Sequence, residues 1–406
     1  MDAFFASVEV LADPSLAGRP VVVGGAGGRG VVASASYEAR RYGIHSAMAM
    51  GEARRLCPGL VVISPRHNRY GEVSAQLMTL LRAETPLVEP VALDEAYLDV
   101  SGAHRLRGSS AEIARSLRAR VGSQLRLGCA VGVGRTKLVA KLASKAAKPR
   151  PGPSGPEAGM GVLVVSSVEE EAFLSAQPVR ALPGVGPRSA ERLARYGVTS
   201  VAELRELGRE RLARLLGATH GGLVHDLALG RDPRAVVPDR PTRSIGHEET
   251  FERDERDLAA LESRARQMAA EVATRCRRAG LFGRTVSVKV RYADFTTVSR
   301  ARTSPRPLRT GAEIGALAGN LLADLPVERG VRLLGVHVSS LGAAEEGSGE
   351  QLALFESPRG SPGAPDWSRR AEAEAAADEV RRRYGSEALG PPRNAPDRTR
   401  RGPSPS

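Results

Sequence analysis

The stretch LDEAYLDV, at residues 93–100, places two adjacent carboxylates, Asp94 and Glu95, directly before a β-rich run. Successive strand residues point to opposite faces, so both acids reach one cation only from a strand edge or a turn. Adjacent acids also repel each other unless a cation offsets the repulsion. Paired carboxylates that hold two metal ions are the usual apparatus of phosphoryl transfer, and their hard oxygens suit Mg²⁺ or Mn²⁺. The plain alternative is a solvated acidic turn, which is the default for an isolated Asp-Glu pair.

Around this stretch, the first 165 residues alternate β-rich runs with helical patterns, which predicts an α+β domain with interleaved elements. The prolines and glycines of residues 148–156 remove backbone donors and favour turns, so this segment is predicted to be an exposed loop. The predicted strands are 21–23, 31–33, 61–63, 97–100, 129–133 and 161–165, and the predicted helices are 75–82 and 111–125.

The pattern changes after residue 165. Residues 166–232 are almost purely helical in pattern, and three prolines mark 233–242 as a linker. Strands and helices return over 243–341. Beyond that point the composition turns to Gly, Glu, Ser, Pro and Arg, which predicts that most of 342–406 is disordered. Two islands interrupt this tail, an apolar cluster at 351–355 and a helix at 368–384.

The whole chain is basic, with 59 Lys and Arg against 46 Asp and Glu in 406 residues, a net charge of +13. This excess predicts a polyanionic partner, nucleic acid before an anionic membrane; the plain alternative is an Arg-favouring genome. Three scattered cysteines without a CxxC pair argue against a disulfide scaffold or a structural zinc site and favour a reducing cytosol. No apolar run approaches the roughly 18 residues that span a bilayer, so no membrane partner is predicted.

The basic residues are concentrated between Arg275 and Arg309, where ten bases accompany one acid, Asp294. Within this window, TVSVKVRY alternates in the manner of a strand, and Lys289 and Arg291 are two residues apart. They are therefore predicted to share a face, as a sheet lying on a duplex backbone requires. The alternative is a solvated charged face.

Three glycine-rich stretches are candidates for phosphate-binding loops. Gly25 to Gly30 fits GxGxxG, but a strand follows instead of a helix, which predicts a hairpin loop and no dinucleotide site. Residues 132–137 lack the spacing of a Walker ATPase loop. By contrast, Pro183-Gly184-Val185-Gly186 precedes a helix and resembles a helix-hairpin-helix turn, whose backbone N–H groups face a DNA phosphate through Gly184 and Gly186. An ordinary helix–helix loop is the alternative.

Five motifs occur in order along the chain: MDAFFASVE at 1–9, ASYEARRYG at 35–43, LDEAYLD at 93–99, VGVGRTK at 131–137 and ASK followed by KP at 143–149. In this order and spacing they resemble the Y-family translesion DNA polymerases of the DNA polymerase IV (DinB) type, from residue 1 to about 341. The resemblance implies a multidomain α+β, right-hand-like polymerase. Its parts would be a ferredoxin-like palm (1–10 and 66–165), small fingers (11–65), a helical thumb with the helix-hairpin-helix (166–232), a linker (233–242), an α/β little finger (243–341) and a tail (342–406).

The resemblance also implies the reaction: template-directed, error-prone translesion synthesis in DNA repair, by a cytoplasmic monomer that adds deoxynucleotides to a primer 3′ end. Its partners would be primer-template DNA and deoxynucleoside triphosphates. Asp94 and Glu95 would bind two Mg²⁺ ions, with Mn²⁺ as the other suitable metal, and Glu95 would lie near the attacking primer hydroxyl.

Further residue roles follow from the same resemblance. Tyr37, Arg40 and Lys148 would contact the incoming triphosphate. Phe5 would be the steric gate, a flat ring that leaves no room for a ribose 2′-hydroxyl, while Phe4 would belong to the core.

In the tail, Gln351-Leu352-Ala353-Leu354-Phe355 is an apolar cluster in a polar segment. Such a peptide typically binds in a partner's groove. It resembles the bacterial sliding-clamp-binding motif, with Gln351, Leu352, Leu354 and Phe355 as the contacts. A chance cluster is the alternative.

The chain departs from the family at its start. The family has another metal-binding Asp two residues before the position of Asp2, at the end of an apolar first strand. We therefore expect a misassigned start codon, with in-frame upstream codons that encode a short apolar strand ending in Asp. The competing hypothesis is a catalytically impaired DNA- and clamp-binding adaptor related to the same family.

Overall fold

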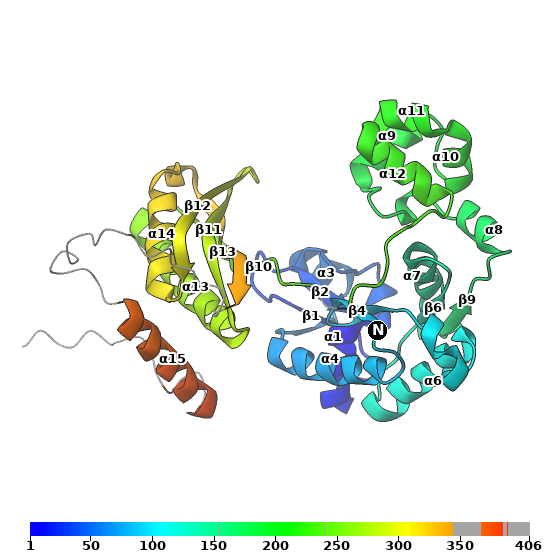
Figure 1. Ribbon diagram of the computed structural model, residues 1–406, viewed down its shortest axis with the longest axis horizontal. Coiled ribbons are helices and arrows are strands. Elements are labelled where there is room, and N and C mark those ends of the chain that lie inside the picture. Colours follow the sequence, from blue (N-terminus) through cyan, green and yellow to red (C-terminus); the bar gives the residue numbers. More distant parts are fainter. Residues whose placement is uncertain (154, 239, 344–366, 385–387, 389–406) are drawn as a thin grey trace, which may run out of the picture. The chain divides into compact units, whose positions relative to one another are not determined.

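The computed structural model describes residues 1–153, 155–238, 240–343, 367–384 and 388. The chain divides into two compact units, residues 1–240 and 241–406 (Figure 1). The apolar cluster 351–355 lies outside the described residues. Over the part that the structure describes, no helix is long and apolar enough to cross a membrane.

The first unit contains a three-stranded sheet near its N-terminal end. Its strands are β1 (Val21–Gly24), β2 (Val32–Ala35) and β3 (Val61–Ile63), in the order β2-β1-β3. β1 is antiparallel to β2 and parallel to β3. The glycine-rich loop between β1 and β2 is a hairpin, as predicted. A Cβ at Gly30 would lie 1.8 Å from the Gly25 carbonyl oxygen, so glycine is required there. Around this sheet lie α1 (Phe4–Ala12), α2 (Tyr37–Arg40) and α3 (Met50–Leu56).

Two further strand pairs carry the acidic stretch and its neighbours. β4 (Val88–Ala92) is antiparallel to β5 (Glu95–Leu98), and β6 (Val131–Val133) is parallel to β9 (Val162–Val164). These pairs are separate sheets, so the described strands of the expected palm do not form one continuous sheet. The helices beside them are α4 (His67–Arg82), α5 (His104–Arg107), α6 (Ser110–Arg120) and α7 (Lys137–Ala146).

One sequence prediction in this region was wrong, and another was confirmed with a change of helix type. The segment 148–156 is not a plain loop but a short antiparallel ribbon, β7 (Arg150–Gly152) and β8 (Gly155–Glu157). Pro151 and Pro156 pair opposite each other, which an isolated two-stranded ribbon tolerates because its outer edges need no donors. The helix predicted over 111–125 ends as α-helix at Arg120, and a π-helical turn completes it to Leu125.

The segment after residue 165 is helical, as predicted. It contains α8 (Glu170–Ser175), α9 (Pro187–Ala194), α10 (Val201–Leu207), α11 (Arg209–Leu216) and α12 (Ala218–Ala228). One apolar cluster holds these helices together, and its fully buried leucines are Leu182, Leu193, Leu204, Leu212 and Leu227.

The predicted linker does not run free of the first unit. The Val237 amide donates to Glu89 Oε2 over 2.8 Å, and Arg240 contacts Glu89 Oε1 over 3.0 Å. Asp232, just before the linker, accepts the Leu138 amide over 3.0 Å. The chain is therefore held on the first unit up to Arg240.

The second unit is a four-stranded antiparallel sheet covered on one face by two helices (Figure 1). Buried Val286, Val288 and Val290 of β11 face the helices. The alternating TVSVKVRY segment is thus a strand of this sheet, as predicted. The strands are β10 (Ser244–Glu255), β11 (Leu281–Tyr292), β12 (Thr297–Leu308) and β13 (Val331–Ala343), in the order β10-β13-β11-β12, and the helices are α13 (Leu258–Arg278) and α14 (Gly311–Ala323).

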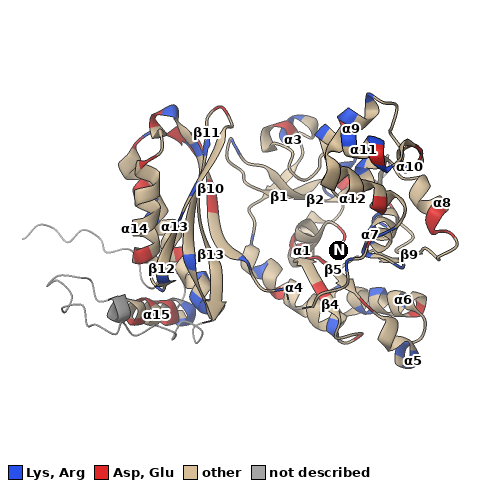
Figure 2. Cartoon of the chain, turned by 45° about the horizontal axis from the view of Figure 1, so that its top comes forward, with Lys and Arg blue, Asp and Glu red and all other residues tan. Residues whose placement is uncertain are grey.

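The helix predicted in the tail is α15 (Trp367–Tyr384), and it docks on the second unit through charges (Figure 2). Arg277 of α13 donates to Glu374 and to Asp378, each over 2.8 Å. Glu374 also accepts the Gly311 amide over 3.0 Å, at the first turn of α14. A carboxylate is favourable at this position because helix N-termini carry unpaired amides.

Candidate active site

Asp94 and Glu95 lie at a hairpin turn. Ala92 of β4 pairs with Glu95 of β5, so Leu93 and Asp94 form the two-residue turn between the strands. Asp94 therefore lies in the turn and Glu95 begins β5, which is a placement at a strand end from which both acids could approach one cation. The Glu95 carboxylate contacts the Lys141 ammonium, and the two side chains are 41% and 46% exposed. Water screens an ion pair this exposed, so its net stabilisation is small.

Lys141 is a functional candidate that sequence reasoning missed. Lys137 and Lys141 are four residues apart in α7 and so share one face of the helix. Lys137 contacts Glu89 of β4, and Lys141 contacts Glu95 of β5. The i,i+4 spacing of these two lysines is the feature of the sequence that could have identified Lys141.

Glu89 and Lys137 form a buried pair next to the exposed one. Their side chains are 4% and 6% exposed. Burial raises the pKa of Glu89, but hydrogen bonds from Lys137 and the Val237 amide outweigh it, so the pKa lies below its usual value. The buried pair fixes α7 against β4 and so sets the position from which Lys141 reaches Glu95.

The first two residues bring the separate parts of the site together. The Met1 nitrogen donates to the Asp94 carbonyl over 2.8 Å, and the Asp2 amide donates to the Gly128 carbonyl over 3.0 Å. Lys148 Nζ lies 3.4 Å from the Met1 carbonyl oxygen. Burial lowers the pKa of the Met1 amino group, while the nearby Asp94 carboxylate raises it. Asp94 and Lys148, which are 54 positions apart in the sequence, thus meet at Met1.

The acidic residues suit a hard divalent cation in their chemistry. Asp2 Oδ1 is buried and has no hydrogen-bond partner in the part of the chain that the structure describes. A buried anionic oxygen without a donor is costly unless a cation compensates it. The carboxylates of Asp94 and Glu95 supply the oxygen ligands that Mg²⁺ and Mn²⁺ prefer. Within the described residues, however, no three His, Cys, Asp or Glu side chains form a ready-made metal cluster.

Tyr37 and Arg40 lie together in the short helix α2. The Arg40 guanidinium carbon lies 4.6 Å from the centre of the Tyr37 ring, and Arg40 Nε donates to the Ala35 carbonyl over 3.0 Å. The Ser36 hydroxyl caps the helix by accepting the Ala39 amide over 3.2 Å. The Tyr37 hydroxyl is buried without a partner among the described residues. Burial raises the pKa of Tyr37, and nearby Asp2 raises it further, which places Tyr37 beside the residue 1–2 segment.

Phe4 and Phe5 differ as the sequence interpretation expected. Phe4 is 4% exposed and belongs to the core, whereas Phe5 is only partly buried. The Phe5 ring stacks on Tyr70 of α4, with centroids 4.2 Å apart and planes 15° apart. Sequence reasoning missed Tyr70, because an aromatic residue at an apolar position of a helix carries no signal beyond core packing.

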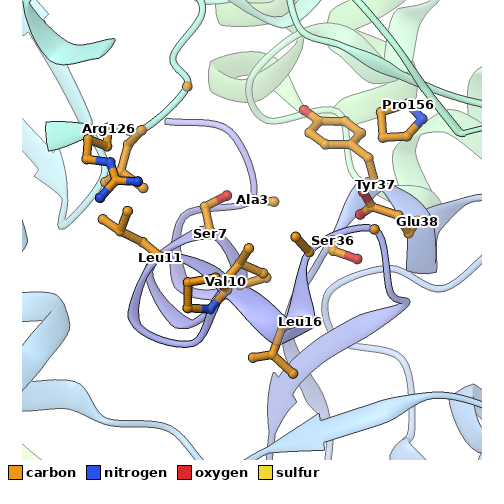
Figure 3. Close-up of a pocket in the computed structure, with 16 residues that line it drawn as sticks. Ala3, Ser7, Val10, Leu11, Leu16, Ser36, Tyr37, Glu38, Arg126 and Pro156 are labelled. Atoms are coloured by element: carbon orange, nitrogen blue, oxygen red, sulfur yellow. The ribbon is translucent and has the colours of Figure 1, made fainter. Parts of the chain in front are cut away.

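A cavity of about 470 Å³ lies against α1 and α2 (Figure 3). Ser7 and Val10 of α1, Tyr37 and Glu38 of α2, and Arg126 line it. Tyr37 belongs both to the cavity wall and to the pair with Arg40, whereas the acids of the β4–β5 turn do not line the cavity. The acidic turn is therefore not part of the cavity wall.

The Pro183-Gly184-Val185-Gly186 segment is a turn before α9, as predicted. Gly184 has φ +90°, which only glycine adopts at low cost. The His220 ring lies 3.0 Å from the Gly184 carbonyl oxygen and braces the turn. Gly186 is the N-cap of α9, and a Cβ there would meet nothing within 4 Å. The backbone around Gly186 is accordingly accessible.

Lys289 and Arg291 lie on the sheet face opposite the helices, as their spacing predicted. The sequence did not reveal their partners. Lys289 Nζ contacts Glu248 Oε2 of β10 over 2.7 Å, and Arg291 Nε donates to the Thr297 hydroxyl over 3.0 Å. Glu248 thus neutralises part of the charge on this face.

Comparisons with known proteins agree on one family. Residues 1–145 match the model of the impB/mucB/samB family, and residues 242–354 match the model of its C-terminal domain. The chain is 46% identical over 357 residues to a DNA polymerase IV of Alkalilimnicola ehrlichii, covering 87% of this chain and 97% of the relative. It is 45% identical to a DNA polymerase IV of Halorhodospira halophila, covering 84% of this chain and 93% of the relative.

Solved structures give the same result for the fold. A Y-family DNA polymerase chimera of Dbh and Dpo4 is similar with a TM-score of 0.73 and 25% identity, over 84% of this chain and 96% of that chain. DinB from Sulfolobus solfataricus is similar with a TM-score of 0.56 and 24% identity, over 83% and 96% of the two chains. The predicted α+β fold class is thereby confirmed.

Proposed function

Because this chain belongs to the impB/mucB/samB family, within the DinB-type Y-family DNA polymerases, we propose that it is a DNA-directed DNA polymerase that performs translesion synthesis in DNA repair. Its substrates are primer-template DNA and deoxynucleoside triphosphates. One observation carries the proposal: Asp94 and Lys148, which are far apart in the sequence, both lie at the residue 1–2 segment that carries Asp2. Next to them, Tyr37 presents a buried hydroxyl without a partner among the described residues.

The triphosphate is bound by the residues around α2 and Lys148. Arg40 offers a planar guanidinium whose orientation is fixed by Tyr37 and the Ala35 carbonyl, and such a fork suits phosphate oxygens. Lys148 adds a point charge. The Tyr37 hydroxyl can donate a hydrogen bond but has no acceptor among the described residues. A phosphate oxygen supplies that acceptor. Together these groups orient the α-phosphate for in-line attack.

Asp94 and Glu95 would hold two Mg²⁺ ions, or Mn²⁺, and Glu95 would be the carboxylate near the primer 3′-hydroxyl. When bound, such ions would lower the pKa of that hydroxyl and offset the negative charge that develops on the phosphates. Lys141 leaves Glu95 readily because both side chains are exposed. Phe5 presents its ring to the sugar and excludes a 2′-hydroxyl.

The remaining parts of the chain bind DNA and a protein partner. Residues 1–10 and 66–165 are the palm, 11–65 the fingers, 166–232 the thumb and 243–341 the little finger. The amides near Gly184 and Gly186 bind backbone phosphates of the primer-template, and Lys289 and Arg291 bind the duplex across the open sheet face. Both contacts are independent of sequence and sensitive to salt.

The tail peptide 351–355 binds the bacterial sliding clamp, and the chain acts as a cytoplasmic monomer. Deleting these five residues removes clamp-stimulated synthesis and leaves basal synthesis unchanged. Equal stimulation of the deleted and full-length chains contradicts the clamp assignment.

The central test is primer extension with Mg²⁺, using the chain as printed and a version extended upstream in frame. Asp94→Asn and Glu95→Gln in each background serve as controls for the acidic turn. Template-directed extension that both substitutions abolish supports the proposal. If the chain binds DNA but extends no primer in either background, the polymerase proposal is overturned in favour of the DNA- and clamp-binding adaptor.

A further inference from the structure

Phe5 contacts a series of aromatic and charged side chains that have no role in the proposed reaction. Its ring lies parallel to Tyr70, and His67 meets it edge-on, with centroids 6.3 Å apart and planes at 89°. Tyr70 is fully buried, whereas Phe5 is partly exposed. One face of the Phe5 ring is therefore covered by Tyr70, and the position of Tyr70 limits how far the Phe5 ring can sink.

The hydroxyl of Tyr70 is anchored by a carboxylate. It donates to Glu9 Oε1 over 2.5 Å. Burial raises the pKa of Tyr70 to about 12, and the Glu9 carboxylate contributes to this rise. A neutral hydroxyl that donates to a carboxylate forms a charge-assisted hydrogen bond, which is stronger than a bond between neutral groups. The bond restrains the Tyr70 ring along its long axis, while the stacked Phe5 covers its face.

Arg66 compensates the buried charge of Glu9. Glu9 is only 3% exposed, and Arg66 donates to both of its carboxylate oxygens, with Nε 3.0 Å from Oε1. The Arg66 side chain is 52% exposed, so its own charge stays hydrated. A buried carboxylate is stable in such a setting because each oxygen has a donor.

The chain of contacts joins two helices. Phe5 and Glu9 are four residues apart in α1 and share one of its faces. Tyr70 lies in the first turn of α4, and Arg66 is the residue before that helix. The order Arg66–Glu9–Tyr70–Phe5 thus runs from the exposed Arg66 through the buried Glu9 and Tyr70 to the partly exposed Phe5.

We propose that Glu9 is a positioning residue for sugar selection, which it exerts by fixing Tyr70 beneath the Phe5 ring. The affected ligand class is the nucleoside triphosphates, and the discrimination is at the 2′ carbon of their sugar. This inference rests on the proposed polymerase function and on Phe5 as the group that excludes the 2′-hydroxyl. Without the Glu9 bond, the Tyr70 ring can shift and the Phe5 ring can follow it, which opens space for the hydroxyl.

The test is single-nucleotide incorporation by the full chain with matched deoxyribo- and ribonucleotides, read as the ratio of their kcat/KM values. Tyr70→Phe keeps the ring and loses the hydroxyl, and Glu9→Gln keeps the shape and loses the charge. We expect each to lower the ratio by about five- to tenfold, through a higher kcat/KM for the ribonucleotide. The double variant should be no worse than either single variant, since both break one bond.

Glu72→Gln is the matched control, because Glu72 lies in the same helix in an exposed pair with Arg69. It should leave the ratio unchanged. Thermal unfolding of each variant checks the fold, and Arg66→Gln, at the exposed end of the chain of contacts, replaces Glu9→Gln should the latter fail to fold.

The outcomes separate the inference from the function beneath it. An unchanged ratio, or an equal fall in kcat/KM for both nucleotides, reduces Glu9 to a structural role and overturns the inference while the polymerase function stands. If Phe5→Ala leaves the ratio unchanged, Phe5 does not exclude the 2′-hydroxyl, and the inference about Glu9 is overturned as well. Absence of any extension by the unsubstituted chain overturns the proposed function and hence this inference.

Discussion

The guanidinium of Arg40 lies over the ring of Tyr37, with its central carbon 4.6 Å from the ring centre, and its Nε is tied to the Ala35 carbonyl. Both contacts come from within six residues of chain. The orientation of the guanidinium is thus set before any nucleotide arrives, which reduces the entropy lost on binding.

We predict that Arg40→Ala raises the KM for the incoming deoxynucleotide by about tenfold or more, because a charge-assisted contact to phosphate is lost. Arg40→Lys should not restore it, since lysine lacks the planar fork and the stacking on Tyr37. Steady-state single-nucleotide incorporation measures both. Arg41→Ala is the matched control, because Arg41 stacks on Tyr42 in the same way at 4.9 Å. An equal rise in both variants counts against a specific role of Arg40.

Removal of Lys141 should ease metal binding. Lys141→Met frees Glu95 from its ion pair and removes a positive charge, so the Mg²⁺ concentration for half-maximal extension should fall by about two- to fivefold. Lys145→Met, one turn further along α7, is the control. A rise in the Mg²⁺ requirement of Lys141→Met would instead mean that Lys141 positions Glu95 for the metal.

The buried pair should dominate the stability of the first unit. Glu89→Gln leaves Lys137 buried without its charged partner, at a cost of about 3–5 kcal/mol in the free energy of unfolding. Urea unfolding at pH 7 measures this cost, with exposed Glu52→Gln as the control. A cost near that of the control contradicts the buried-pair assignment.

The same residue gives a pH dependence. The pKa of Glu89 is lowered from 4.5 in the folded chain. Its contribution to stability is therefore complete above the unfolded-state pKa and is lost as the pH falls through the lower folded-state pKa. Urea midpoints between neutral and acidic pH should show this loss in the unsubstituted chain, and Glu89→Gln should lack that part of it.

The turn before α9 should tolerate a side chain at one glycine and not at the other. Gly184→Ala forces alanine to φ +90°, at a cost of about 1–2 kcal/mol, and crowds His220 at 3.3 Å. We expect weaker primer-template binding by fluorescence anisotropy at fixed salt. Gly186→Ala, at φ −77° and in open space, should retain most of the affinity. The reverse order of effects would exclude the proposed use of this turn.

The tail helix should detach when its charged contacts are removed. Asp378→Asn weakens a contact with Arg277 in which the side chains are 13% and 14% exposed. We expect faster hydrogen exchange throughout α15 and a loss of about 1–3 kcal/mol of docking free energy, with basal primer extension unchanged. Glu379→Gln is the control, since Glu379 pairs with Arg382 inside α15. Unchanged exchange in Asp378→Asn would show that other contacts hold the helix.

Local pattern predicted the acidic turn and the principal strands. LDEAYLDV allows both acids to reach one cation only from a strand edge or a turn, and the Ala92–Glu95 register places Asp94 in a turn. The TVSVKVRY alternation likewise placed Lys289 and Arg291 on one face. Such predictions succeed because the side-chain period of a strand is a property of the backbone alone.

The tertiary contacts were not predicted because they join segments that are far apart in the sequence. Glu9 meets Tyr70 across 61 residues, and Glu89 meets Val237 across 148. No periodicity encodes such pairs. The docking of α15 was equally hidden, because charged residues at i,i+4 spacing carry it in place of an apolar stripe.

The anchorage of Val237 and Arg240 on Glu89 changes the length of the tether between the two units. Ten residues were expected to be free, but only 241–243 separate Arg240 from the first residue of β10. Three residues span at most about 10 Å, against about 35 Å for ten. A short tether limits the volume that the second unit can reach, and it would raise the effective concentration of that unit at any DNA bound to the first. Through its contacts with Val237 and Arg240, Glu89 thereby sets the residue at which the tether begins.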